Sequence, residues 1–149
     1  MASNERRIGT TPERVWDVLA DGWLYPLWVV GATRMRDVDD TWPAVGSRLH
    51  HSVGSWPVLV DDTTSVLECT PHSLLRLRAR AWPTGDAHVT IQLSGAGADT
   101  LVEIDEDAAS GPALLVPKPA RDLGLHWRNV ESLRRLAFLA ERRADPARP

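Results

Sequence analysis

The sequence predicts an α+β fold in which antiparallel strands pack against one long C-terminal helix. Two observations support this prediction. The run from Lys118 to Arg143 has clear helical periodicity, and several shorter segments before it alternate apolar and polar residues, with turn residues between them. A sheet with one apolar face needs a cover, and the long helix is the element available to provide it.

The expected helix over residues 118–143 is amphipathic. On a helical wheel, one stripe consists of Leu123, His126, Trp127, Val130, Leu133, Ala137 and Ala140. The other side carries Arg121, Arg128, Glu131, Arg135 and Arg142. Pro117 and Pro119 suit a helix start, because the fixed φ of proline fits the first turn. This pattern is typical of a helix laid on a core, and it lacks the apolar run that a membrane span requires.

Polar residues interrupt the expected inner stripe of this helix. One interpretation places His126 and Asn129 at the edge of the stripe, where they bond water or a neighbouring carbonyl. The other places both side chains over a polar pocket beneath the helix. Val130, on the same stripe, is a further candidate ligand contact. The sequence leaves both interpretations open.

The elements before the sheet are short. A polar edge strand is expected over residues 4–9, and a helix follows it with Pro12 in its first turn and Gly22 at its end. A second short helix is expected over residues 23–28. The first strand is therefore followed by two short helices.

The middle of the chain is predicted to be a series of strands. The expected strands cover residues 32–39, 47–53, 56–69, 75–81, 88–93 and 102–107. The clearest is 75–81, where leucine and alanine alternate with Arg76, Arg78 and Arg80. Consecutive strands joined by short turns predict an antiparallel meander.

Length and composition set limits on function. A chain of 149 residues fits one domain over residues 1–149, with 144–149 as a frayed tail. The net charge is −3 with acidic and basic residues mixed, so no nucleic-acid partner is expected. The single cysteine, Cys69, excludes an internal disulfide. The N-terminal residues lack the apolar core of a signal peptide, so the expected location is the cytoplasm.

Taken in order, these elements and their local sequences resemble the SRPBCC superfamily, which includes START-like, birch-pollen-allergen-like and polyketide cyclase/dehydrase proteins. The opening helix of that family is similar to TTPERVWDVLADG, and its Trp–Val–x–Gly and Pro–x–Val–Gly–Ser stretches are similar to LWVVGATRMRDVDDTWPAVGSRL. The two central strands are similar to TSVLECTPHSLLRLRARAWPTGDAHVTIQL. The likeness covers nearly the whole chain.

The resemblance implies a helix-grip fold, with a curved sheet of about seven antiparallel strands around the C-terminal helix. It also implies a cavity between sheet and helix that holds lipids, sterols, polyketides or other hydrophobic molecules. The matching motifs are structural rather than catalytic, so they specify the fold better than the function.

Several polar side chains are expected to meet inside the fold. Projecting the apolar face of each strand inward brings together His51, Asp62 and Glu106, with His126 and Asn129 from the helix. We take His51 and Glu106 as candidate catalytic residues, because a histidine with a carboxylate supports proton transfer. A buried lone carboxylate is costly, so Glu106 should be paired, hydrated or protonated. Alternatively, both carboxylates lie near strand ends and reach solvent.

Tryptophan supplies seven of the nine aromatic residues. Most are expected in the core or at its rim, and a share lining a cavity would suit a flat, apolar ligand. The candidates for the rim are Trp23, Tyr25, Trp28 and Trp56.

Other catalytic and metal-binding patterns are not found in the sequence. It has no nucleophile elbow, phosphate loop or paired-histidine zinc motif. His50 and His51 are adjacent on a strand and point to opposite faces, so they do not form one metal site. No metal or cofactor is expected.

Three functions fit these observations. The first is a carrier that binds a small hydrophobic molecule (a lipid, a polyketide or an aromatic compound), and the second is a polyketide cyclase/dehydratase of the aromatase type in the same cavity. The third is a partner or stress-response module with a small cavity. A carrier needs apolar walls with a polar anchor, whereas a cyclase needs a proton donor and acceptor beside the substrate. The expected oligomeric state is a monomer or homodimer, without a membrane span.

Overall fold

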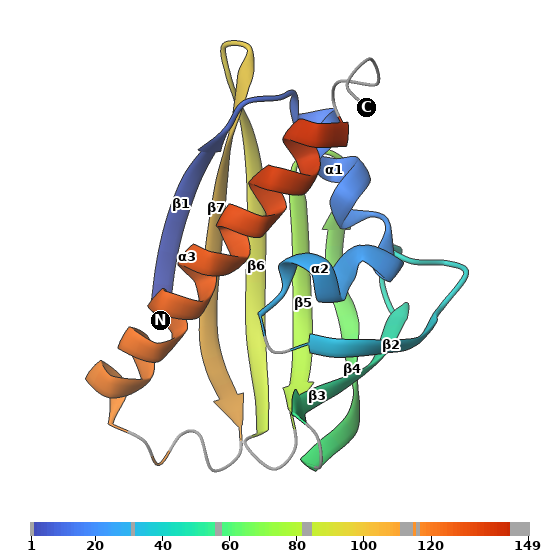
Figure 1. Ribbon diagram of the computed structural model, residues 1–149, viewed down its shortest axis with the longest axis vertical. Coiled ribbons are helices and arrows are strands. Elements are labelled where there is room, and N and C mark those ends of the chain that lie inside the picture. The colour runs from blue at the N-terminus through green and yellow to red at the C-terminus, as the bar shows by residue number, and fades with distance from the viewer. Residues whose placement is uncertain are drawn as a thin grey trace.

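The computed structural model describes residues 2–30, 32–55, 58–81, 85–110, 115 and 117–143. It contains one sheet with helices on one of its faces (Figure 1). The elements in chain order are β1 (Ala2–Ile8), α1 (Pro12–Leu19), η1 (Gly22–Leu24), α2 (Tyr25–Trp28), β2 (Ala32–Val38), β3 (Arg48–Ser55), β4 (Val58–Thr70), β5 (Leu74–Ala81), β6 (Gly85–Ala96), β7 (Asp99–Ser110) and α3 (Lys118–Arg143).

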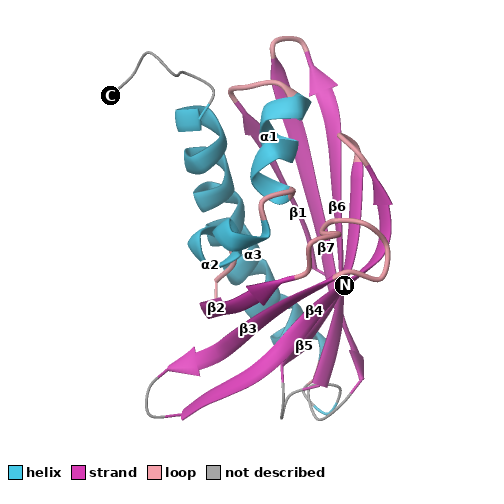
Figure 2. Ribbon diagram, turned by 90° about the vertical axis from the view of Figure 1, so that its right-hand side faces the viewer, coloured by secondary structure: helices cyan, strands magenta, loops and turns pink. Residues whose placement is uncertain are grey.

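The sheet has seven strands in the order β1-β7-β6-β5-β4-β3-β2, and every neighbouring pair is antiparallel. It twists strongly, and α3 runs diagonally across the face that also carries α1 and α2 (Figures 1 and 2). This arrangement confirms the predicted helix-grip fold. The expected polar edge strand also forms: β1 pairs with β7 from Ala2 opposite Glu106 to Ile8 opposite Thr100.

The alternation in β5 and β6 produces the two faces of the sheet. On β5, Leu75 and Leu77 are buried, whereas the alternating residues Arg76 and Arg78 are exposed. The register sets Leu77 opposite Val89, so the inner faces of neighbouring strands align. The sequence pattern therefore gives one apolar face for the helices to cover.

The short helices are held tightly against the edge of the sheet. A Cβ on Gly22 would lie 2.5 Å from Leu49 Cδ2 and 2.8 Å from Val38 Cγ1, so only glycine allows this approach. The Asp21 side chain accepts a hydrogen bond from the Trp23 backbone N–H at 3.2 Å. These contacts fix the start of α2 and with it Tyr25.

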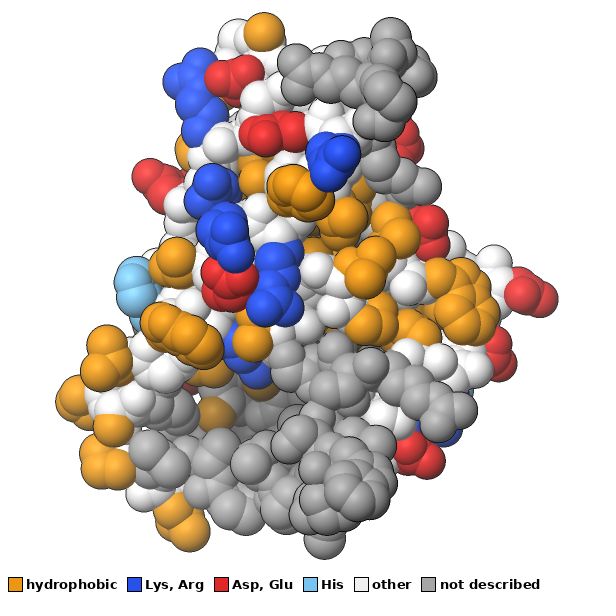
Figure 3. Space-filling view, viewed as in Figure 1, with side chains coloured by type: hydrophobic (Ala, Val, Ile, Leu, Met, Phe, Trp, Pro, Cys, Tyr) orange, Lys and Arg blue, Asp and Glu red, His pale blue; other side chains and the backbone are white. Residues whose placement is uncertain are grey.

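The helical wheel was wrong for the N-terminal half of α3. The buried positions are Asn129, Ser132, Leu133, Leu136, Ala137 and Ala140. Leu123 and Trp127 are each 70% exposed and Val130 is 46% exposed. The first turns of α3 project past the sheet, so their apolar side chains have no layer to pack on, and Figure 3 shows hydrophobic side chains at the surface there. Among the described residues, no helix is long and apolar enough to cross a membrane.

Candidate functional site

A pocket of about 220 Å³ lies between the sheet, α2 and α3. Its apolar wall on the sheet side consists of Leu77, Ala79, Val89, Ile91 and Ile104. On the opposite side, Trp28, Val29 and Val30 follow one another from α2. The polar lining residues come from α2, four strands and α3. The pocket is thus mainly apolar with a few polar groups, as small-molecule sites usually are.

Three polar side chains on one side of the pocket form a hydrogen-bonded series. His51 Nε2 lies 2.7 Å from Thr64 Oγ1, and the Tyr25 hydroxyl lies 3.4 Å from the same oxygen. The His51 and Tyr25 rings also stack, with centroids 5.6 Å apart and an interplanar angle of 24°. Because the Thr64 hydroxyl can donate or accept, it can satisfy either tautomer of His51.

Burial keeps both ring systems uncharged. It lowers the pKa of His51 below its ordinary value of 6.5, and the nearby Asp62 carboxylate only partly opposes this effect. Burial also raises the pKa of the Tyr25 phenol, against the smaller opposing effects of Thr64 and Arg128. Near neutral pH the pocket therefore contains a neutral imidazole beside a protonated phenol.

Glu106 and Arg128 form an ion pair across the pocket. Arg128 Nη2 of α3 donates to Glu106 Oε1 of β7. The Glu106 side chain is 2% exposed and the Arg128 side chain 37% exposed, so the arginine connects a buried carboxylate with solvent. The carboxylate is thus paired, which avoids the cost of a lone buried charge.

Two nitrogen atoms at the pocket lack a hydrogen-bond partner among the described residues. They are His51 Nδ1 and Asn129 Nδ2, and both side chains are 2% exposed. Leaving a buried polar atom unpaired is unfavourable in a folded protein, and such atoms are uncommon away from functional sites. The two atoms belong to opposite walls, since His51 is on β3 and Asn129 is on α3.

The structure brings five of the residues predicted from sequence to this pocket: Tyr25, Trp28, His51, Glu106 and Asn129. Asp62 is buried close by, opposite His51 in the strand register. Its Oδ1 lies 3.8 Å from Nε of Arg80, which lines the pocket.

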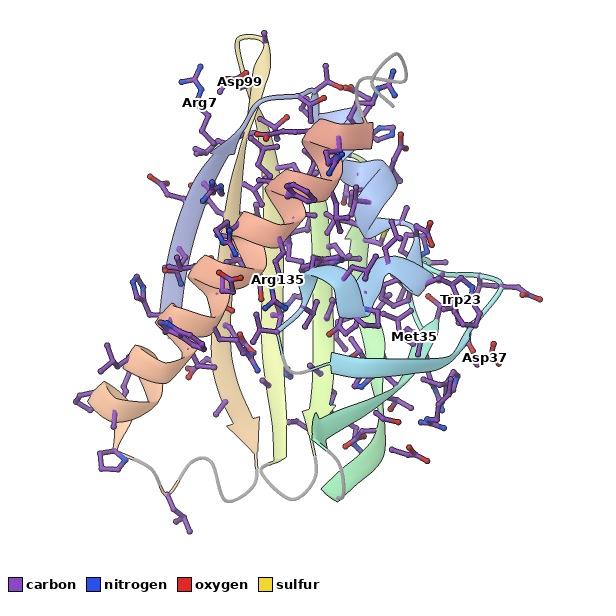
Figure 4. The ribbon with its side chains drawn as sticks, viewed as in Figure 1. Arg7, Trp23, Met35, Asp37, Asp99 and Arg135 are labelled. Carbon is purple, nitrogen blue, oxygen red and sulfur yellow. The ribbon has the colours of Figure 1, made fainter. Side chains whose placement is uncertain are left out.

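Other predicted residues lie elsewhere. Trp23 is 56% exposed on η1, on the outer side of the short helices (Figure 4), and does not line the pocket. His126 is exposed on the first turns of α3, and Val130 is exposed because it faces solvent although its neighbour Asn129 lines the pocket, so neither residue reaches the pocket. Trp56 lies outside the described residues.

Sequence reasoning missed two polar residues that α3 contributes. The helical wheel predicts Arg128 on the solvent side of the helix, and Ser132 is not among the predicted site residues. The Ser132 hydroxyl accepts a hydrogen bond from the Val30 backbone N–H at 3.2 Å, which ties α3 to the segment after α2. The spacing of Asn129, Leu133 and Leu136 is the signal that would have given the correct phase.

The described residues contain no group of three or more His, Cys, Asp or Glu side chains arranged to hold a metal ion.

A twisted antiparallel sheet around a long terminal helix, with a mainly apolar pocket between them, defines a helix-grip protein with an internal pocket. The family model described as polyketide cyclase / dehydrase and lipid transport matches residues 2–141. The chain belongs to this family, which confirms the resemblance seen in the sequence.

Solved structures share the fold. Protein NE0264 from Nitrosomonas europaea has a TM-score of 0.73 at 17% identity, covering 95% of this chain and 94% of that one. Protein MLL2253 from Mesorhizobium loti has a TM-score of 0.71 at 23% identity, covering 95% and 96%. The di-domain ARO/CYC StfQ from the steffimycin biosynthetic pathway has a TM-score of 0.70 at 12% identity, covering 96% of this chain and 51% of StfQ. None of the curated proteins matches the sequence.

Proposed function

We propose that this protein binds a small, largely apolar molecule in the pocket between the sheet and α3, and that it acts as a carrier. The polar end of the ligand bonds to His51 and Asn129, and its apolar part lies against Leu77, Val89 and Ile91. The family to which the chain belongs supports a role in binding hydrophobic ligands or in cyclisation.

The observation that carries this proposal is the pair of unpartnered nitrogens, His51 Nδ1 and Asn129 Nδ2, at one mainly apolar pocket. A site that evolved only to be a filled core would gain by replacing both side chains with apolar ones. A ligand with a polar group satisfies these atoms and at the same time buries its apolar surface.

The size of the pocket limits the ligand. A volume of about 220 Å³ is below the roughly 300–1,000 Å³ typical of pockets for drug-sized molecules. The pocket therefore favours a compact molecule, such as a small aromatic compound, over a sterol or a long acyl chain.

A second candidate function is that of a cyclase or dehydratase. It is favoured by the neutral His51 imidazole, whose Nδ1 can accept a proton, beside donor groups on Tyr25 and Arg128. One solved structure with the same fold is described as a di-domain ARO/CYC. In this function His51 acts as the general base, while Glu106 holds Arg128 in place.

The binding function can be tested by tryptophan fluorescence. We expect compact aromatic compounds to change the emission of the wild-type protein. Trp28 is buried at the pocket and Trp23 is exposed away from it, so the matched variants Trp28→Phe and Trp23→Phe separate the two sources. The change should disappear in Trp28→Phe and persist in Trp23→Phe. Silence across a panel of compact aromatic compounds and small polyketide mimics, with no co-purified small molecule by mass spectrometry, contradicts the proposal.

The two candidate functions differ in what His51 does. In a cyclase, His51→Gln abolishes turnover of a bound polyketide mimic while leaving most of its affinity, because glutamine still bonds but takes no proton. In a carrier, no turnover is detected with either protein. Binding and turnover should therefore be measured separately.

The remaining expectations from the sequence stay proposals. They are a single domain over residues 1–149, a cytoplasmic location, a monomeric or homodimeric state and no nucleic-acid partner.

A further inference from the structure

Resting on the proposed binding function, we infer that the ligand is an uncharged molecule with a hydrogen-bond-accepting oxygen, such as a ketone or ester carbonyl, and that Glu106 sets this preference by neutralising Arg128. The inference rests on the charges around the pocket, the polarity of its unpartnered atoms and its volume.

The charge balance begins with the ion pair. Arg128 lines a mainly apolar pocket, and a lone guanidinium there would attract carboxylates or phosphates strongly. Its Nη2 instead donates to Glu106, whose side chain is 2% exposed. An anionic ligand would have to lose its hydration and lie close to the Glu106 carboxylate, with little net attraction left.

The other charged side chain at the pocket is also neutralised. Among the described lining residues, Arg80 is the second arginine. Its Nε lies 3.8 Å from Asp62 Oδ1 and 3.5 Å from Asp86 Oδ1. Burial holds His51 neutral and Tyr25 protonated, as the directions of their pKa shifts show. The described part of the pocket therefore carries no charge that is left for a ligand to balance.

Several hydrogen-bond donors line the pocket. Asn129 Nδ2 can only donate, and it lacks a partner among the described residues. Arg128 has five N–H groups, and its bond to Glu106 involves Nη2. His51 Nδ1 can donate when the Thr64 hydroxyl donates to Nε2. These donors match a carbonyl oxygen, and an apolar ligand without an acceptor would leave them unpaired.

A matched series of two-ring compounds tests the inference in the wild-type protein. The ketone is 2-acetylnaphthalene, the carboxylate is 2-naphthoate and the hydrocarbon is 2-ethylnaphthalene, and their affinities are measured by calorimetry. We expect the ketone to bind about tenfold more tightly than either of the other two, as expected for one buried hydrogen bond gained or one charge excluded.

Charge variants test the role of Glu106. Glu106→Gln removes the negative charge but keeps the shape, so Arg128 becomes available to an anion. We expect 2-naphthoate to gain about tenfold in affinity and the ketone to change by less than about threefold. Glu103→Gln is the matched control, because Glu103 lies three residues earlier on β7, faces Glu5 and Gln92 in the strand register and does not line the pocket. It should leave both affinities unchanged.

The double variant Glu106→Gln/Arg128→Gln restores a neutral pocket and should lose the gained affinity for naphthoate. Circular dichroism and thermal unfolding show whether each variant is folded, and the wild-type series decides the ligand class even where a variant is not.

Wild-type binding of naphthoate or the hydrocarbon as tight as that of the ketone overturns the inference but leaves the binding function standing. A folded Glu106→Gln protein that gains nothing for naphthoate also overturns it. Failure of all three compounds to bind wild type overturns the inference, and when the fluorescence panel and mass spectrometry are also negative, the binding function falls with it.

Discussion

The interior of the molecule has two halves that are built from the same strands. In the half near α1, the inner positions are apolar and closely packed, with Leu49, Val66, Leu75, Leu93 and Val102 all buried. The other half begins a few residues further along each strand. Its inner positions surround the pocket and include His51, Thr64 and Glu106. The α3 helix changes in the same way, from Leu136 and Ala140 over the packed half to Asn129 and Arg128 at the pocket.

The two halves of the sheet therefore differ in role: one mainly stabilises the fold, and the other provides the pocket. The packed half contributes most of the apolar burial, which stabilises the fold by about 25 cal/mol per Å² of surface removed from water. The pocket half keeps polar atoms that lack a partner among the described residues, and an ion pair whose carboxylate is buried; a core selected for stability alone would not retain them. We therefore expect mutations in the first half to change the unfolding free energy, and mutations in the second to change ligand binding.

The largest effect is expected in the packed half. Leu136 is fully buried on α3, and Leu136→Ala keeps a good helix former while leaving a cavity. We expect the unfolding free energy to fall by about 2–5 kcal/mol in urea denaturation. A loss below about 1 kcal/mol would mean that this half is not the main source of stability, and the comparison would break down.

In the pocket half, Asn129→Leu should have the opposite profile. Leucine removes the buried Asn129 Nδ2, which lacks a partner among the described residues, so the unfolding free energy should stay constant or rise by up to about 1 kcal/mol. The affinity for a carbonyl ligand should fall by about tenfold, because one hydrogen bond is lost. Urea denaturation and calorimetry on the same preparation check both values. A large loss of stability with unchanged affinity would contradict the separation of the two halves.

A smaller effect is expected from the pH. Because the pKa of His51 is lowered in the folded protein, the unfolded chain takes up this proton first as the pH falls below about 6.5. The unfolding free energy should therefore decrease with falling pH from this point until the folded protein is itself protonated, with a slope of at most about 1.4 kcal/mol per pH unit. Subtracting the pH profile of His51→Gln from that of the wild type isolates this contribution. A flat difference would show that His51 is not held neutral in the folded protein.

The smallest effect is expected outside both halves, on the projecting turns of α3. Trp127 is 70% exposed, and serine has a similar helix propensity, so Trp127→Ser should change the unfolding free energy by less than about 0.5 kcal/mol. Ligand affinity should not change. A loss of more than about 2 kcal/mol in thermal or urea unfolding would mean that this side chain is covered in solution.

The sequence predicted the fold because its signals are local. Alternation along β5 and β6 identified the inner face, and the same rule correctly brought His51 and Glu106 to the interior. The contribution of α3 was harder to predict, because Leu123 and Trp127 shifted the helical wheel although both side chains are exposed in the structure. Arg128 was missed for this reason: its position depends on where the helix leaves the sheet, which is set by tertiary packing.

The pocket groups that α3 supplies, Arg128, Asn129 and Ser132, come from little more than one helical turn, and the residues that anchor the helix follow directly after them. Substitutions confined to that turn would alter which compound is recognised while the scaffold persists. Descendants of one ancestral gene could therefore diverge toward different small molecules through a change at Asn129, whereas a change at Arg128 also requires one at Glu106, whose buried carboxylate would otherwise lose its partner.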